Sequence, residues 1–167
     1  IDGKLKLLED EQIVTPGFIE VVAKMILSDL QRQQLVNQKE ITTAFSLNPQ
    51  ARFKVTAVYQ RGSLAISLHV ISSTVRRLDD LNMPPVVTGF AQLTKGLIIV
   101  TGPYGSGKTT TLNAIVNAIN ETRAAAIVTI EQPIEYLFVN NQSLIEQREV
   151  GRDALSVEQA VIAASRE

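Results

Sequence analysis

The spacing of hydrophobic residues predicts two helices near the start of the chain. Thr15-Pro16 suits a helix N-terminus, because threonine caps free N–H groups and proline fits the first turn. The residues that follow are apolar at helical spacing, at positions 18, 19, 22, 25 and 26, which predicts a buried face. A second helix is expected from Ser28-Asp29 to about Asn37.

From residue 40 onwards the hydrophobic period changes to two. Apolar and polar residues alternate over 41–47, 53–59 and 64–70. Turn residues separate these segments at Asn48-Pro49 and at Arg61-Gly62-Ser63. The pattern predicts an antiparallel meander of strands with one buried face.

After a connector over residues 72–85, the pattern changes to strand, helix and strand. A short helix is expected at about 86–93, and an apolar run bounded by glycine, residues 96–101, predicts a buried parallel strand. Residues 110–119 are apolar at helical spacing, and residues 125–130 form a second buried run. Strand, helix and strand of this length predict a right-handed parallel crossover.

The last part of the chain adds a short strand and a helix. The strand is expected at 143–148, and the helix at 156–166, where Ser156 is the N-cap. The whole sequence therefore predicts an α/β fold in two parts. Residues 1–80 form a small antiparallel α+β domain, and residues 81–167 form a parallel α/β domain.

The composition is that of an ordinary globular protein, with 45% hydrophobic and 20% charged residues among 167. A net charge of −1 gives no electrostatic reason to expect nucleic-acid binding. The absence of cysteine excludes disulfides and thiolate metal sites. No run reaches the roughly 18 apolar residues of a transmembrane segment. Both ends of the sequence look cut, and we expect a fragment of a longer protein.

One stretch carries specific chemistry, because residues 102–109 fit the phosphate-loop template of glycine, four residues and Gly-Lys-Ser/Thr. The stretch consists of Gly102, Pro103, Tyr104, Gly105, Ser106, Gly107, Lys108 and Thr109. Glycines let successive N–H groups face one anion, and the next helix directs its positive end at phosphates. Lys108 would meet the β- and γ-phosphates, and the Thr109 hydroxyl would ligate Mg²⁺. A chance glycine-rich turn is the alternative, which the predicted flanking strand and helix disfavour.

A site that hydrolyses nucleotides also needs an acidic group near the γ-phosphate, to orient water or help hold Mg²⁺. Glu131 ends the apolar run at 125–130, and α/β sheets bind ligands at the carboxyl ends of their strands. Glu131 is therefore the candidate catalytic residue. The alternative is a carboxylate at the end of a strand that simply faces solvent.

Three stretches, residues 102–112, 127–135 and 147–153, together resemble the type IV pilus retraction ATPases, the PilT-like branch of the type II/IV secretion ATPases. Within the last of them, the run from Gln147 to Gly151 indicates the retraction branch rather than the pilus assembly branch. Shorter matches extend the resemblance over nearly the whole chain, at Asp2-Gly3-Lys4, Arg52-Phe53 and Tyr59-Gln60-Arg61-Gly62.

The resemblance implies a homo-hexameric motor that uses ATP and Mg²⁺ on the cytoplasmic side of the bacterial inner membrane, with a platform protein of that membrane as partner. It implies a PAS-like N-terminal domain followed by the first half of a RecA-like P-loop NTPase domain. Glu131 falls on the catalytic glutamate of the family's Asp box, and Thr110 joins the nucleotide-binding residues. Arg52 and Arg61 are the nearest matches to arginines that reach nucleotide across subunits, and simple solvation is their alternative role.

Three departures from the family pattern bear on activity. Gln132 stands where the Asp box has aspartate, which removes a negative charge near Mg²⁺, and Tyr104 replaces a residue that is often small. The sequence also lacks the Walker B and His box segments and the first strand and helix of the N-terminal domain, so the fragment alone is expected to be inactive.

The predicted function is that of a P-loop ATPase motor subunit that powers pilus retraction, the basis of twitching motility. One alternative is a subunit that binds nucleotide in such a hexamer without hydrolysing it, which Gln132 favours. The other is a pilus assembly or type II secretion ATPase.

Overall fold

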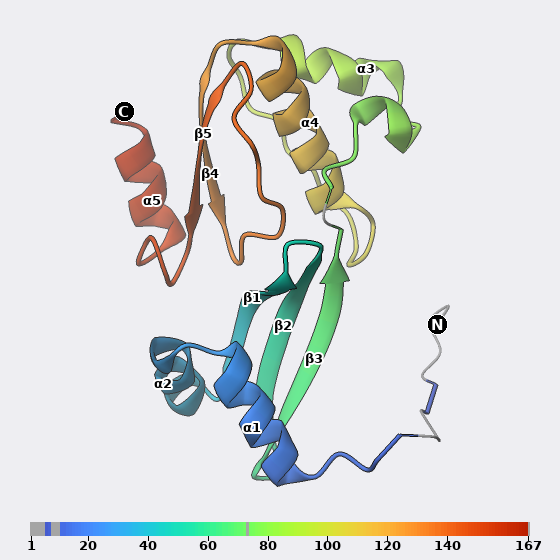
Figure 1. Ribbon diagram of the computed structural model, residues 1–167. Coiled ribbons are helices and arrows are strands. Elements are labelled where there is room, and N and C mark those ends of the chain that lie inside the picture. The colour runs from blue at the N-terminus through green and yellow to red at the C-terminus, as the bar shows by residue number, and fades with distance from the viewer. Residues whose placement is uncertain (1–5, 8–10, 73, 167) are drawn as a thin grey trace. The chain divides into compact units, whose positions relative to one another are not determined.

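The computed structural model describes residues 6–7, 11–72 and 74–166 (Figure 1). The match to the family at Asp2-Gly3-Lys4 lies outside these residues. Among the helices of the described residues, none is long and apolar enough to cross a membrane.

Contacts divide the chain into two compact units. The first comprises Ile1–Ile41 and Val55–Ser67, and the second comprises Thr42–Lys54 and Leu68–Glu167. The domain boundary at residue 80 remains a prediction from the sequence.

Two capped helices belong to the first unit, as the sequence predicts. In α1 (Pro16–Ile26), the Thr15 hydroxyl accepts a backbone N–H of the first turn at 3.3 Å. In α2 (Asp29–Gln38), Ser28 and Gln31 form a reciprocal capping box that satisfies two N–H groups at once. These local hydrogen bonds explain why both helices begin where the capping residues stand.

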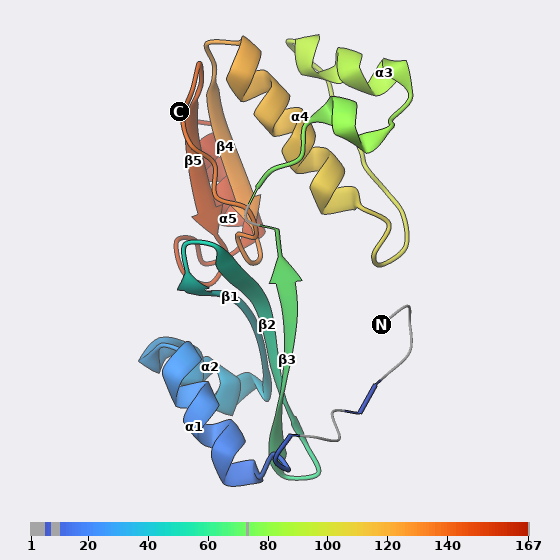
Figure 2. The ribbon, with the colours of Figure 1, turned by 45° about the vertical axis from the view of Figure 1, so that its right-hand side comes forward.

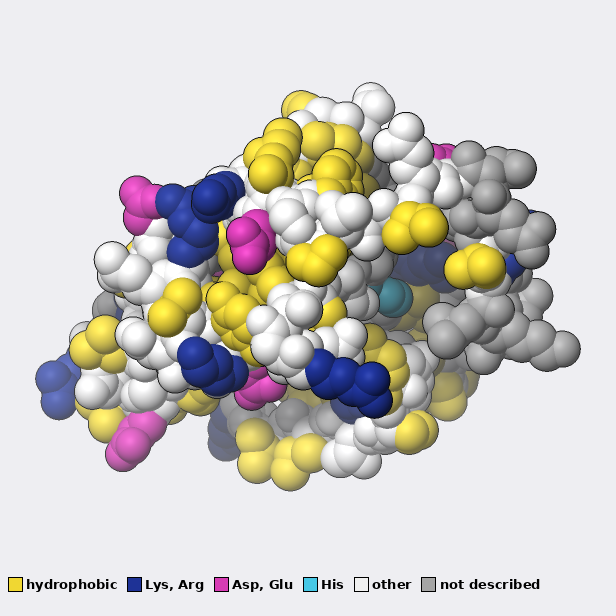
Figure 3. Space-filling model, turned by 90° about the horizontal axis from the view of Figure 1, so that it is seen from below, with side chains coloured by type: hydrophobic (Ala, Val, Ile, Leu, Met, Phe, Trp, Pro, Cys, Tyr) yellow, Lys and Arg dark blue, Asp and Glu magenta, His cyan; other side chains and the backbone are white. Residues whose placement is uncertain are grey.

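The core of the first unit joins the helices to a strand. Its buried residues are Ala23, Leu27, Leu35 and Ala57. The buried face of α1 runs through Ile19 and Ile26, whereas Phe18 and Met25 were predicted for that face and are exposed. Because successive helical residues are about 100° apart, Phe18 and Met25 point away from the face that contains Ile19 and Ile26. Figure 3 shows hydrophobic side chains exposed among charged ones.

Three strands form a sheet in the order β1-β2-β3, comprising β1 (Glu40–Asn48), β2 (Ala51–Gln60) and β3 (Ser63–Ile71). Adjacent strands joined by two-residue turns run antiparallel, so the predicted meander is confirmed. At the second turn Arg61 and Gly62 have φ angles of 49° and 80°, the left-handed pair that two-residue hairpins use.

Short helices and one long helix pack together in the second unit. They are η1 (Leu78–Leu81), α3 (Pro85–Thr88), η2 (Gly89–Gln92) and α4 (Lys108–Thr122). The predicted short helix at 86–93 is present as α3 and the tighter turn η2. Their shared core consists of Leu78, Val87, Ala114 and Ile115.

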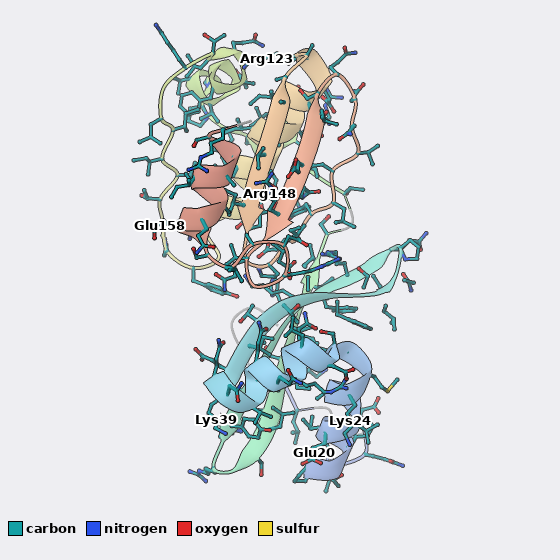
Figure 4. All side chains as sticks on the ribbon, turned by 90° about the vertical axis from the view of Figure 1, so that its left-hand side faces the viewer. Glu20, Lys24, Lys39, Arg123, Arg148 and Glu158 are labelled. Carbon is teal, nitrogen blue, oxygen red and sulfur yellow. The ribbon has the colours of Figure 1, made fainter. Side chains whose placement is uncertain are left out.

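The C-terminal end of α4 is anchored by polar contacts. The Arg123 guanidinium donates to the carbonyls of Ala91 and Leu93 at 3.1 and 2.9 Å (Figure 4). The buried side chain of Asn120 donates to the Val139 carbonyl at 2.9 Å and accepts from the Asn141 N–H at 3.0 Å. Both residues therefore tie the helix to segments that are distant in sequence.

Two parallel strands, β4 (Ala126–Glu131) and β5 (Leu144–Glu149), confirm the predictions for 125–130 and 143–148. In their register Thr129 pairs with Gln147 and Glu131 pairs with Glu149. The last helix, α5 (Val157–Ala164), is capped by Ser156 as predicted. The α/β fold class, with an antiparallel meander followed by parallel strands, is confirmed.

The predicted strand at 96–101 is wrong, because the structure has no helix or strand at residues 97–102. Leu97 and Ile99 are 84% and 71% exposed, so this apolar run is not buried. A strand exists only when a neighbouring strand pairs with its backbone, and β4 is paired with β5 in a sheet of two strands. The predicted crossover from this run through α4 to β4 is therefore not formed in the described chain.

Candidate functional site

The loop over residues 102–109 leads directly into α4, which begins at Lys108. Gly105 and Gly107 have φ angles of 77° and 89°, a left-handed backbone that glycine adopts without strain. The Gly107 carbonyl accepts the Thr111 N–H at 2.8 Å, which starts the helix. Because the first N–H groups of a helix have no acceptor within it, this end can donate to an anion.

The first glycine of the loop, Gly102, closely approaches the side chain of Ser106. A Cβ atom on Gly102 would lie 2.6 Å from Ser106 Oγ and 3.4 Å from Ser106 Cβ. The Ser106 N–H also donates to the Pro103 carbonyl at 3.3 Å, so the loop folds back upon itself. The residues present therefore fit a cradle made of backbone atoms, which is what a phosphate group needs.

The charge of Lys108 lies over this cradle. Its Nζ atom donates to the carbonyls of Gly102 and Pro103 at 2.9 and 2.8 Å. An ammonium has three N–H donors, so one remains beyond these two bonds. The ammonium of Lys108 thus lies at the loop itself, where it can interact with an anion bound by the N–H groups of the loop and of the first turn of α4.

The other loop residues are open to solvent. Thr109, the predicted Mg²⁺ ligand, is exposed and Thr110 is partly buried, both in the first turn of α4. Tyr104 is 91% exposed. Among the described residues no group of three or more acidic or histidine side chains could hold a metal ion.

Glu131 is the last residue of β4, and its carboxylate is held on one side. Oε1 accepts from the Thr129 hydroxyl at 2.7 Å and from Gln147 Nε2 at 3.1 Å. No hydrogen bond to Oε2 is made within the described part of the chain. Glu131 is partly buried, so it is neither enclosed in the core nor fully exposed to solvent.

The segment that follows Glu131, residues 132–138, packs against side chains of β5. Gln132 is exposed, and the Gln132–Pro133 peptide bond is cis. The Ile134 N–H donates to the buried carboxylate of Glu149 at 3.0 Å. The path of the chain after the candidate carboxylate is therefore determined by side chains of β5.

The loop and Glu131 lie at the same end of the second unit. Figures 1 and 2 show the loop before α4 and the C-terminal ends of β4 and β5 on one side. This edge is where α/β sheets bind ligands. The structure thus places the loop and the C-terminal end of β4 at the same end of the second unit.

The two candidate arginines have different surroundings. Within the second unit, the Arg52 guanidinium donates to Ile134 O at 2.6 Å, Glu135 O at 2.9 Å and Ser46 Oγ at 2.8 Å. Arg61 lies in the turn between β2 and β3 and is exposed. Their contacts with a nucleotide across subunits remain a prediction.

Two residues that the sequence did not single out as site residues contact Glu131. They are Thr129 and Gln147, which pair in the register of β4 and β5. Side chains two residues apart on a strand share a face, so Thr129 and Glu131 lie on the same side. Alternation in 126–131 could have pointed to Thr129, but only the strand register brings in Gln147.

A loop that fits the template of glycine, four residues and Gly-Lys-Thr and opens a helix is the defining feature of the class of P-loop proteins. Residues 22–166 match the family described as Type II/IV secretion system protein, and the chain belongs to that family.

The chain is also similar to pilus proteins. It is 41% identical over 142 residues to a twitching motility protein of Neisseria gonorrhoeae, covering 85% of this chain and 38% of that protein. It is 37% identical over 142 residues to the type IV pilus retraction ATPase PilT of Pseudomonas aeruginosa, covering 85% and 41%. These similarities confirm the predicted resemblance to the PilT-like branch.

A solved structure agrees. The crystal structure of the pilus retraction motor PilT with bound ADP matches with a TM-score of 0.89 and 38% identity, over 100% of this chain and 49% of that chain. The chain thus spans less than half the length of each of these three relatives.

Proposed function

We propose that this chain is part of an ATP-hydrolysing motor subunit that powers type IV pilus retraction and thereby twitching motility. The supporting observation is the loop at 102–109, where Gly102 closely approaches Ser106 and Lys108 donates to two carbonyls of the loop. The similarity to a PilT structure with bound ADP supports the same assignment.

In this proposal the loop binds the phosphates of ATP. The N–H groups of the loop and of the first turn of α4, which includes Thr110, donate to phosphate oxygens. Lys108 exchanges its two carbonyl contacts for the β- and γ-phosphates, and the Thr109 hydroxyl contributes to a Mg²⁺ site. When bound, the ion neutralises charge on the phosphates.

Glu131 is the proposed catalytic residue. With Oε1 already bonded to Thr129 and Gln147, its Oε2 atom is available to accept a proton or a hydrogen bond from the attacking water. A carboxylate held in place costs little reorganisation during the reaction, and phosphoryl transfer relies chiefly on such positioning.

The larger organisation is proposed from the resemblance. A PAS-like domain covers residues 1–80 and the first half of a RecA-like domain covers 81–167. The whole protein forms a homo-hexamer at the cytoplasmic face of the inner membrane, where it acts on a platform protein. Arg52 and Arg61 are proposed to approach the nucleotide of a neighbouring subunit.

A second function has one observation in its favour. Gln132 follows Glu131 where the family pattern has aspartate, and an amide cannot accept a proton or bind a cation as a carboxylate does. The whole protein could then bind ATP within the hexamer without turnover.

Phosphate release by the whole protein with Mg-ATP, measured beside an ATP titration, tests both functions. Turnover that Lys108→Ala abolishes is the expected result. Binding of ATP with no phosphate release would favour the second function, and the absence of binding would contradict both.

A further inference from the structure

A glutamine of β5 lies at the centre of the hydrogen bonds around Glu131. Gln147 Nε2 donates to Glu131 Oε1 at 3.1 Å and to the Tyr136 carbonyl at 2.8 Å. Gln147 Oε1 accepts the Phe138 N–H at 2.9 Å. One partly buried side chain thus contacts both the candidate carboxylate and the segment that follows it.

The orientation of this amide is fixed by its partners. A backbone N–H can only donate, so the atom facing Phe138 must be the oxygen. A carbonyl and an ionised carboxylate can only accept, so the atom facing Tyr136 and Glu131 must be the nitrogen. Gln147 therefore has one arrangement that satisfies all three bonds, and a flipped amide would break each of them.

The consequence for Glu131 is that one oxygen is anchored from two sides. Gln147 and Thr129 both donate to Oε1, and both lie on the sheet face of Glu131 by strand register. Two donors at one oxygen restrict rotation of the carboxylate, and hydrogen bonds to a charged group are stronger than neutral ones. Oε2 is left as the oxygen for other partners.

The backbone beyond Glu131 is held by the same strand. Gln147 binds Tyr136 and Phe138, and Glu149 binds the Ile134 N–H. Because Gln147 and Glu149 are two residues apart, both side chains project from one face of β5. The candidate carboxylate is thus fixed through its own oxygen and through the segment that follows it.

We propose that Gln147 is a positioning residue for ATP hydrolysis, which keeps the Glu131 carboxylate in a single orientation toward the attacking water. The inference rests on the proposed catalytic role of Glu131. Gln147 does not touch the nucleotide in this account, so its loss changes turnover and leaves nucleotide binding intact. A glutamine is needed because leucine has no polar atom and glutamate has no donor when ionised.

The test compares Gln147→Leu with Gln142→Leu in the whole protein. Gln142 is exposed, and its side chain takes no part in the bonds around Glu131. Gln147→Leu is expected to lower kcat on the order of 10-fold, while KM and ADP affinity stay within about 2-fold of the unchanged protein. This is the result expected when the lost charge-assisted hydrogen bond stabilises the transition state and not the bound nucleotide. Gln142→Leu is expected to change none of these quantities.

A double-mutant cycle separates positioning from a purely structural role. If Gln147 acts through Glu131, then adding Gln147→Leu to Glu131→Gln lowers kcat by less than about 2-fold further. Gln147→Met keeps the approximate side-chain length without a charge, so it is the second variant if leucine is not tolerated. Gln147→Glu keeps the acceptor for Phe138 but sets a second carboxylate beside Glu131. It loses the donors and is expected to lower kcat at least as much as leucine does.

The swapped pair sharpens the result. In Glu131→Gln combined with Gln147→Glu, the repulsion between two carboxylates is removed but the Tyr136 carbonyl still lacks its donor. The melting temperature should therefore rise above that of Gln147→Glu alone, while kcat stays as low as in Glu131→Gln alone. An equal fold-loss from Gln147→Leu in both backgrounds, or unchanged kcat in Gln147→Leu and Gln147→Glu, overturns the positioning role alone. Unchanged kcat in Glu131→Gln overturns the proposed catalytic role and this inference with it.

Discussion

The loop before α4 contributes mainly backbone atoms to the candidate site, whereas the end of β4 contributes side chains. The loop uses backbone atoms, with left-handed glycines at 105 and 107 and the Lys108 ammonium over two carbonyls. The end of β4 uses side chains, with Glu131 held by donors from two strands. The first part should therefore be sensitive to added atoms, and the second to the loss of a donor or an acceptor.

The sharpest test of this comparison is Glu131→Gln in the whole protein. An amide of the same shape keeps the packing but cannot act as a base, so kcat is expected to fall about 100-fold or more. Nucleotide affinity should stay the same, because Glu131 lies outside the loop. Steady-state phosphate release and ADP titration measure the two quantities.

Glu146→Gln is the matched control, since Glu146 lies on the opposite face of β5 and is bonded to Arg148 (Figure 4). Its kcat should remain within about 2-fold of the unchanged protein. A comparable loss of kcat in both variants would mean that general charge, and not the site, controls turnover.

Lys108→Ala should affect binding instead. Losing one charge-assisted contact costs about 2 kcal/mol, which corresponds to roughly 30-fold in the ATP dissociation constant. The control is Lys24→Ala, on an exposed position of α1 (Figure 4), which should leave affinity unchanged. Equal affinities of Lys108→Ala and the unchanged protein would remove the loop from the site.

The difference between a local backbone loop and a cluster of side chains from two strands also explains what the sequence could predict. The loop is a local pattern of eight consecutive residues, 102–109, so its chemistry could be inferred without the fold. Helix caps such as Thr15 and Ser28 were predictable for the same reason. Gln147 was not, because it meets Glu131 across 16 residues through a register that no local pattern specifies.

The apolar run at 96–101 is the reverse case, because the sequence predicted a strand that the structure does not have. Its composition is that of a buried strand, but burial and pairing depend on neighbours that the run itself does not contain. In the described chain Leu97 and Ile99 are exposed and no strand forms there. Hydrophobicity therefore predicted the preference of the segment but not its environment.

Gly102→Ala tests the backbone character of the loop. The added Cβ would lie 2.6 Å from Ser106 Oγ, so the Ser106 side chain or the loop must move, and the φ angle of 156° at Gly102 adds backbone strain. Crowding and strain of this kind cost about 1–3 kcal/mol. We expect about a 10-fold loss of ATP affinity. Gly89→Ala is the control, because a Cβ there meets nothing within 4 Å.

Ser106→Ala added to Gly102→Ala removes the nearest clashing atom and should restore part of the lost affinity. A full loss that Ser106→Ala does not change would mean that backbone strain at Gly102, where φ is 156°, dominates over the contact.

The smallest expected effect concerns Gln132, the residue that separates hydrolysis from binding without turnover. Its side chain is exposed beside Glu131, so Gln132→Asp should not change the melting temperature. A second carboxylate near the cation should raise kcat by a few-fold with little change in KM, because the interaction is made chiefly in the transition state. Phosphate release by the whole protein over a range of ATP concentrations measures both. If kcat stays flat or falls, the amide at 132 is neutral for catalysis, and the non-hydrolysing alternative loses the observation that favours it.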